Sequence, residues 1–272
     1  MDSGNPTSAD YPLLCHYRRY PTMSAQVKVL LAIVSLCLLM LFFVSCGQAT
    51  EGQSSHNGNP KRPEHTTTSH ITYVAIGASD TFGIGTGDPY TQNWPSDLAG
   101  KLGPHVHLIN LGIPGIRVHD ALSLELPIAL DSHPDLVTIW LAVNDLANNV
   151  PIDSYSKDLD LMLSRLQSKA PHARILVANV PDLALLPYFR SGDSLVLQNR
   201  IQAYNTAISS IVYRHHVILV DLSQQSYNLR DHPEYVSNDG LHPTDIGYEK
   251  LAELFYKALQ QKPTSSGSAK NT

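Results

Sequence analysis

The stretch ITYVAIGASD, residues 71–80, decides the fold, because a near-continuous apolar run ends there in a glycine, an alanine and a serine. Apolar runs without polar alternation are typical of parallel strands that helices cover on both faces. Similar runs occupy residues 106–110, 136–141, 175–180 and 217–222, and longer segments separate them. Strands that alternate with helical segments indicate βαβ units. The sequence therefore predicts a three-layer α/β/α fold with a parallel sheet of about five strands.

Helices are predicted in the intervening segments, where apolar residues recur every three or four positions. The first stripe follows Asp153 or Ser154, either of which is a suitable N-cap residue. The stripes are Tyr155, Leu159, Met162, Leu163 and Leu166; Leu197, Ile201, Tyr204, Ile208 and Ile211; and Leu251, Leu254, Phe255 and Leu259. We interpret all three as core surfaces of amphipathic helices, without a direct role in function.

Composition argues against several classes of protein. The net charge is −5 and Lys and Arg form no cluster, so we expect no nucleic-acid partner, which would require a concentrated basic surface. All three cysteines lie at or before Cys46, so the predicted domain contains neither disulfides nor cysteine metal ligands. The histidine pairs His105/His107 and His215/His216 lack a third ligand at suitable spacing. We expect no metal and no cofactor.

The N-terminal region is typical of an export signal. An apolar run, VLLAIVSLCLLMLFFV (residues 29–44), precedes Ser45-Cys46. As a helix it would be roughly 24 Å long, shorter than the roughly 30 Å hydrocarbon core of a bilayer, which favours a signal-peptide h-region. Residues 43–46 resemble a bacterial lipobox, which implies a lipidated Cys46 and a protein anchored in the membrane on its cell-surface or periplasmic side. An uncleaved transmembrane anchor and ordinary cleavage stay open, as does a start at Met23 instead of Met1.

The chain divides into four predicted segments. Residues 1–46 form the signal or anchor region, and residues 47–70 form a polar linker with too few large apolar residues to build a core. The folded domain is expected over residues 71–262, a length typical of one domain. Residues 263–272 are predicted to be a disordered tail.

Two motifs suggest nucleophilic chemistry. Ser79 follows the first strand, but a serine hydroxyl is a weak nucleophile until a base removes its proton. Near the C-terminus, Asn238-Asp239-Gly240-Leu241-His242-Pro243 places a carboxylate three residues before an imidazole. Asp239 can accept a hydrogen bond from His242 Nδ1–H, which fixes the tautomer and leaves Nε2 to face the serine. Taken alone, a serine after a strand is more often a turn or helix-cap residue, and the Asp-His motif is equally typical of a surface turn.

Polar or glycine-rich residues follow two further strands. The loop Asn110-Leu111-Gly112-Ile113-Pro114-Gly115 can present a backbone N–H without a side chain in the way, and Asn144 offers its side-chain amide. Ligands of open parallel sheets bind outside the carboxyl ends of the strands, so we expect Ser79, this loop and Asn144 to meet there. Together with the Ser79 N–H, these groups are candidate donors for an oxyanion hole.

In these four motifs and their order, the chain resembles the SGNH (GDSL-type) hydrolases over essentially the whole folded unit. The family's Gly-Asp-Ser-Leu block corresponds to residues 77–80, its glycine block to 110–115, its Gly-x-Asn-Asp block to 142–145, and its Asp-x-x-His block to Asp239 and His242. The chain departs from the family pattern at Ala78, Asp80 and Ala142. None of these changes removes a group that performs the chemistry, so we expect them to affect substrate preference and loop geometry.

The resemblance implies a flavodoxin-like strand order and a cofactor-free serine esterase acting on an ester of a small molecule, a glycan or a lipid. It implies a catalytic triad of Ser79, His242 and Asp239. It also implies an oxyanion hole formed by Ser79, Gly115 and Asn144. Two alternatives stay open. One is a non-catalytic SGNH-like domain that binds a glycan or lipid outside the cell, and the other is an acyltransferase that uses the same residues.

Overall fold

The computed structural model describes residues 70–224, 229 and 231–261. Three predictions for the N-terminal segments fall outside these residues, namely the apolar run 29–44, the lipidation of Cys46 and nearly all of the polar linker. The predicted tail lies outside them as well. Within the part of the chain that is described, no helix is both long enough and apolar enough to cross a membrane.

Five parallel strands form a sheet in the order β2-β1-β3-β4-β5, which confirms the predicted flavodoxin-like arrangement. The strands are β1 (Ile71–Gly77), β2 (Val106–Asn110), β3 (Leu136–Trp140), β4 (Arg174–Ala178) and β5 (Ile218–Val220). The last strand is half as long as predicted. Beyond it, the Leu222 and Ser223 N–H groups donate to Asn179 Oδ1 at 2.7 and 3.2 Å instead of extending the ladder.

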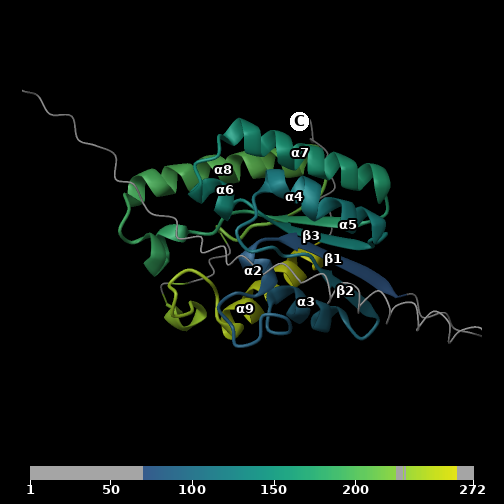
Figure 1. Cartoon of the computed structure of the whole chain (residues 1–272), viewed down its shortest axis with the longest axis horizontal. Coiled ribbons are helices and arrows are strands. Elements are labelled where there is room, and N and C mark those ends of the chain that lie inside the picture. The colour runs from purple at the N-terminus through teal and green to yellow at the C-terminus, as the bar shows by residue number, and fades with distance from the viewer. Residues whose placement is uncertain (1–69, 225–228, 230, 262–272) are drawn as a thin grey trace, which may run out of the picture. The chain divides into compact units, whose positions relative to one another are not determined.

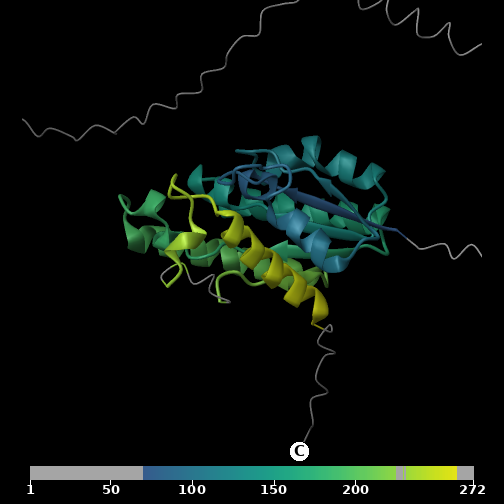
Figure 2. The ribbon, with the colours of Figure 1, turned by 90° about the horizontal axis from the view of Figure 1, so that it is seen from below.

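Helices cover both faces of the sheet, as predicted for three layers. Figure 1 shows α4, α5, α7 and α8 on one face and α3 and α9 on the other, and Figure 2 shows α9 crossing the second face. The helices are α2 (Ser79–Phe82), α3 (Trp94–Leu102), α4 (Val118–Leu124), α5 (Leu126–Asp131), α6 (Val143–Ala147), α7 (Ile152–Lys169), α8 (Ser194–Arg214) and α9 (Asp245–Gln260). Short 3₁₀ turns form η1 (Leu183–Leu185), η2 (Pro187–Phe189) and η3 (Pro233–Tyr235).

The start of α7 corrects one prediction. Its N-cap is Pro151, not Asp153 or Ser154, and the helix begins at Ile152. Pro151 has φ −59° and ψ 137°, and it makes no capping side-chain hydrogen bond. The ring fixes a φ close to the helical value, so proline can begin the helix without a polar cap. Asp153 instead lies in the first turn, where a carboxylate is stabilised by the helix dipole.

The predicted apolar stripes form the core. Every member is buried except Leu197, which is half-buried. Trp94 of α3 stacks on Phe255 of α9, with ring centroids 4.1 Å apart, and this contact joins the two helices of one layer. On the other face, Tyr155 and Tyr204 pack with centroids 5.0 Å apart and join α7 to α8. Burial of such large rings holds the helices on the sheet and thereby fixes the loops at its carboxyl edge.

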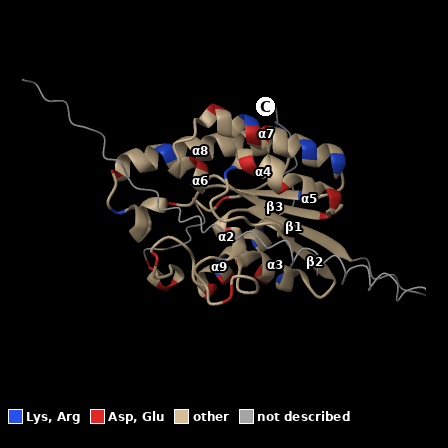
Figure 3. Cartoon of the chain, in the orientation of Figure 1, with Lys and Arg blue, Asp and Glu red and all other residues tan. Residues whose placement is uncertain are grey.

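Charged side chains are dispersed over the described surface. Figure 3 shows Lys and Arg interspersed with Asp and Glu along α7 and α8, rather than gathered into one patch on the face in view. Individual pairs such as Arg214–Asp160, at 2.8 Å, are exposed. Pairs of this kind contribute little to stability. The packed core therefore supplies most of the stabilisation.

Candidate active site

The chain leaves β1 in a tight turn that makes Ser79 the first residue of α2, at the carboxyl edge of the sheet. Gly77 is needed for this turn, because a Cβ there would lie 2.0 Å from Thr81 Oγ1 and 3.0 Å from the Trp140 carbonyl oxygen. The turn ends at Gly83, whose φ of 111° is tolerated by glycine. Ser79 is half-buried and is positioned by this backbone geometry.

The second motif forms a turn closed by hydrogen bonds to one carboxylate. His242 Nδ1 lies 2.6 Å from Asp239 Oδ2, and Asp239 Oδ1 accepts from Ser237 Oγ, Leu241 N–H and His242 N–H at 2.8–2.9 Å. Partial burial by itself raises the pKa of the Asp239 carboxyl. The hydrogen bonds, first among them that from His242, nevertheless hold this pKa well below its ordinary value. An ionised carboxylate only accepts, which assigns the proton to Nδ1 and leaves Nε2 as the basic nitrogen.

The Ser79 turn and the Asp239–His242 turn lie against each other. A Cβ at Gly85, which follows α2, would lie 3.0 Å from His242 Cβ and 2.3 Å from the Pro243 carbonyl oxygen. Gly85 has φ 104°, so both the backbone and the close approach require glycine. Ser79 Oγ makes no hydrogen bond to His242 or to any other described residue. Hydrogen bonds of this kind are often long without substrate and tighten when it binds.

The loop after β2 packs on the same turn. Asn110 Nδ2 donates to the Thr81 carbonyl oxygen at 2.7 Å, and the Ile113 N–H donates to the Gly77 carbonyl oxygen at 3.0 Å. A Cβ at Gly112 would lie 2.5 Å from the backbone nitrogen of Phe82. This loop is therefore fixed against the residues that carry Ser79.

Asn144, in α6, connects the third strand exit to this loop. Its Nδ2 donates to the Ile116 carbonyl oxygen at 2.9 Å, one residue beyond Gly115. Gly115 is exposed, has φ 81°, and its N–H donates to no acceptor among the described residues. The Ser79 N–H has no acceptor among them either. The Ser79 and Gly115 N–H groups thus have no acceptor among the described residues. They lie on two segments that contact each other, and the Asn144 amide binds the second of these segments.

Ala142, which precedes α6, has an unusual backbone. Its φ is 136°, in a region where a Cβ clashes with the neighbouring peptide groups. A non-glycine residue in such a region costs about 1–3 kcal/mol, and such strain is often found at functional sites. The strain lies two residues before Asn144, at the position where the resembling family has glycine.

A buried acid that the sequence did not single out lies beneath the Ser79 turn. Glu125 is fully buried between α4 and α5, and its Oε1 accepts from the Gly77 N–H at 3.3 Å. Its Oε2 has no partner among the described residues. Burial raises the pKa of Glu125 to about 8, although the Gly77 hydrogen bond opposes this. In the sequence, Glu125 is a single glutamate among apolar residues of a helical segment, and this pattern does not show that its side chain is buried.

Asp80, the last residue of the first family block, lies near the Asp239–His242 turn. Burial raises the pKa of its carboxyl to about 6; His242 opposes this rise and Asp239 adds to it. The side chain borders a small apolar cavity of about 30 Å³, together with Leu183 of η1 and Leu241 of the Asp239–His242 turn. A leucine at position 80 would carry no charge, so its burial would not remove water from a charged group.

The η2 turn borders the Asp239–His242 turn on its outer side. The Tyr188 N–H donates to the Gly240 carbonyl oxygen at 3.0 Å, and the Tyr188 and Phe189 rings pack edge to face, 5.2 Å apart. The Tyr188 side chain is 61% exposed, so an aromatic surface is presented to solvent beside the base. Among the described residues, no three His, Cys, Asp or Glu side chains are grouped to hold a metal ion.

The parallel sheet thus brings a serine, a glycine loop, an asparagine and an Asp-His turn to its carboxyl edge, where open α/β sheets bind their ligands. The chain belongs to the GDSL-like Lipase/Acylhydrolase family, whose model matches residues 75–250. It is accordingly a carboxylic ester hydrolase of the GDSL type.

Known proteins similar to this chain include esterases and lipases. An arylesterase of Vibrio mimicus is 27% identical over 187 residues, which cover 66% of this chain and 84% of that protein. The lipase/acylhydrolase of Enterococcus faecalis has a TM-score of 0.58 at 22% identity, over 72% of this chain and 100% of that one. An acetyl xylan esterase has a TM-score of 0.57 at 21% identity, over 70% and 100%. The two structural likenesses support the fold.

Proposed function

We propose that the protein hydrolyses carboxylic esters through Ser79 as nucleophile, His242 as general base and Asp239 as the residue that orients the imidazole. The observation that carries the proposal is the 2.6 Å hydrogen bond between Asp239 and His242, in a turn that packs on the segment following Ser79. It supports a base with Nε2 available, held next to a serine at the end of a strand.

In the proposed reaction, Ser79 Oγ attacks the ester carbonyl carbon while its proton passes to His242 Nε2. The tetrahedral oxyanion is stabilised by the Ser79 N–H, the Gly115 N–H and the Asn144 amide. When the intermediate collapses, the imidazolium gives its proton to the leaving alcohol and an acyl-serine remains. His242 then takes a proton from water, which attacks the acyl-serine, and it returns that proton to Ser79 Oγ as the acid is released. Asp239 stays ionised throughout, as its lowered pKa requires.

Ester hydrolysis is tested with nitrophenyl esters of graded acyl length and the purified full-length protein beside its Ser79→Ala variant. We expect the variant to lose at least about 10³-fold in kcat, because a triad without its nucleophile keeps only binding and oxyanion stabilisation. Equal rates for the two proteins would overturn the serine mechanism. Release of nitrophenol that depends on an added alcohol, with ester rather than acid as product, would identify an acyltransferase instead.

We also propose that the protein is exported and anchored in the membrane through a lipid on Cys46. The support is the order of sequence features alone, an apolar run of residues 29–44 followed by Ser45-Cys46 and a polar segment. Mass spectrometry of the mature N-terminus tests this. A diacylated N-terminal Cys46 is expected, and an unmodified residue other than Cys46 at the N-terminus would refute lipidation.

A further inference from the structure

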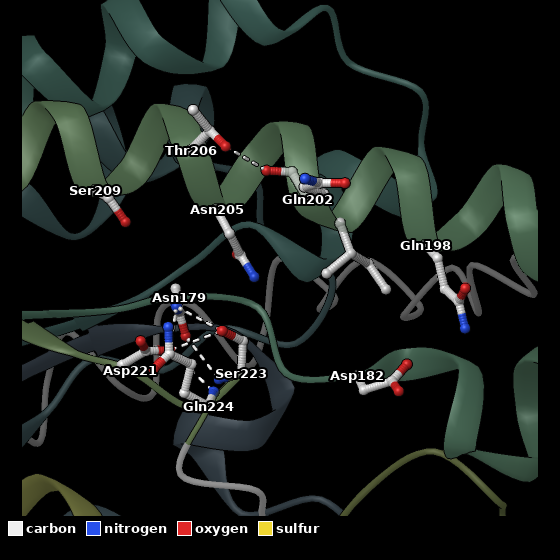
Figure 4. Close-up of a pocket in the computed structure, with 11 residues that line it drawn as sticks. Asn179, Asp182, Gln198, Gln202, Asn205, Thr206, Ser209, Asp221, Ser223 and Gln224 are labelled. Carbon is white, nitrogen blue, oxygen red and sulfur yellow. Dashed lines mark hydrogen bonds between the residues drawn. The ribbon is translucent and has the colours of Figure 1, made fainter.

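A groove beside the outer strands is separate from the Ser79 turn. It has a volume of about 490 Å³ and lies between α8 and the carboxyl ends of β4 and β5. That volume is within the range of about 300–1,000 Å³ typical of ligand sites. In Figure 4, α8 forms one wall, and Asn205 points from it toward Asn179; Asp182 and Ser223 lie on the opposite side. None of the residues of the proposed triad lines this groove.

The chemistry of the lining is almost wholly polar. Ten of its eleven residues carry an amide, hydroxyl or carboxylate, and Ile201 is the exception. On α8 the contributors include Gln198, Gln202, Asn205 and Ser209, spaced three or four residues apart, so one face of the helix is polar where it faces the groove. Gln198 and Gln202 are exposed, and Asn205 and Ser209 are half-buried, so this stripe runs along the edge of the helix face that packs on the sheet and is accessible from solvent.

Part of the lining is already fixed in place. Asn179, 2% exposed, donates from Nδ2 to Asp221 Oδ1 at 2.8 Å, and Ser223 Oγ donates to the same oxygen at 2.7 Å. Burial by itself raises the pKa of Asp221, but the hydrogen bonds it accepts hold that pKa below its ordinary value. Asn205 is held by Val180, whose N–H it accepts at 2.9 Å and to whose carbonyl oxygen it donates at 2.8 Å. These residues form a rigid base for the groove.

Other lining side chains have hydrogen-bonding capacity left over. The amides of Gln198, Gln202 and Gln224 and the hydroxyl of Ser209 make no hydrogen bond within the described part of the chain. Each amide offers both donors and an acceptor. Gln198, Gln202 and Ser209 lie on the α8 wall, and Gln224 lies on the opposite wall beside Asp221, so both walls offer free hydrogen-bonding groups.

The lining selects among ligand classes. It contains no Lys, Arg or His among the described residues, so it is unsuited to phosphates, nucleic acids and free fatty acids. One apolar residue is too little for an acyl chain or for the anchoring side chains of a bound peptide. Sugar hydroxyls both donate and accept, and they match amides, hydroxyls and carboxylates. We propose that this groove binds a neutral oligosaccharide, independently of the Ser79 site.

The test is isothermal titration calorimetry of the full-length protein with neutral tetrasaccharides built from β-linked glucose, xylose or N-acetylglucosamine. Sorbitol and a neutral Ser/Asn peptide serve as the polyol and peptide probes. We expect saturable binding of at least one tetrasaccharide, which Gln198→Ala/Gln202→Ala weakens at least about tenfold, or about 1.4 kcal/mol. Asn199→Ala removes an exposed amide from the same helix, outside this groove, and should leave binding unchanged.

Several outcomes would overturn the proposal. They are no binding of any tetrasaccharide, equal affinity of the double variant and the wild type, or preferential binding of sorbitol or the peptide. Should the double variant not fold, as judged by circular dichroism, Gln224→Ala tests the opposite wall with the same expected weakening. Ser79→Ala should bind the tetrasaccharide as the wild type does. Loss of binding in that variant would place the ligand at the ester site instead.

Discussion

Glu125 makes the stability of this protein depend on pH in a way that one substitution removes. Its pKa rises from an ordinary 4.5 to about 8 because the carboxyl is fully buried. Between pH 4.5 and about 8, Glu125 keeps a proton in the folded protein that it has released in the unfolded chain. The stabilisation is therefore fully present below pH 4.5 and is lost as the pH rises toward about 8.

The magnitude follows from the two pKa values. At about 1.36 kcal/mol per pH unit, the span from 4.5 to about 8 corresponds to a loss of about 5 kcal/mol from this group. Glu125→Gln keeps an oxygen to accept the Gly77 N–H and cannot ionise. We expect the variant to match the wild type at pH 5 within about 1 kcal/mol and to be more stable by several kcal/mol at pH 8.

Urea unfolding at half-unit steps between pH 5 and 8 measures this, with the free energy of unfolding extrapolated to water at each pH. Asp131→Asn is the control, because this exposed carboxylate at the end of α5 makes no hydrogen bond or ion pair within the described part of the chain. The control should follow the wild-type curve. A Glu125→Gln variant with the same pH dependence as the wild type would refute the idea that this carboxyl is neutral and buried.

Four further substitutions test other parts of the structure, one of them against a reference variant. Asp239→Asn should lower kcat about 10³–10⁴-fold, measured with a nitrophenyl ester, because the amide favours the wrong imidazole tautomer; retention of full rate would contradict the proposed role. Gly77→Ala should destabilise the protein by more than about 3 kcal/mol in urea unfolding because its methyl overlaps a neighbouring threonine. Gly100→Ala, in open space on α3, should stabilise it by about 0.5–1 kcal/mol. Ala142→Gly should be at least about 1 kcal/mol more favourable than Ala147→Gly, since only the first relieves a positive φ; equal thermal shifts would count against strain.

The fold was predictable because each strand is a continuous apolar run and each long helix an apolar stripe. Parallel strands are expected because these strands alternate with helices along the chain. Local ends were less predictable. Asp153 and Ser154 are better capping residues by preference than Pro151, but proline's fixed φ starts α7 earlier. The fifth strand ends early because the Leu222 and Ser223 N–H groups donate to Asn179 Oδ1 instead of extending the strand. Nothing in the sequence of residues 217–222 indicates this contact.

The candidate site was predictable where chemistry follows spacing along the chain. The Asp239–His242 hydrogen bond is local, and strand exits meet wherever parallel strands end together. Contacts between distant segments were not predictable. Glu125 lies 48 residues from its partner Gly77, and nothing in the sequence connects the two. The strain at Ala142 likewise depends on its positive φ, which could not be predicted from the sequence.

Covalent labelling tests the role of Ser79 most directly. The full-length protein is treated with a fluorophosphonate, which reacts with serines activated by a neighbouring base, and the modified residue is located by peptide mass spectrometry. The proposed mechanism predicts one adduct, on Ser79, that forms at least about 10³-fold more slowly in His242→Ala. An adduct on another residue, or labelling of Ser79 at an unchanged rate without His242, would contradict it.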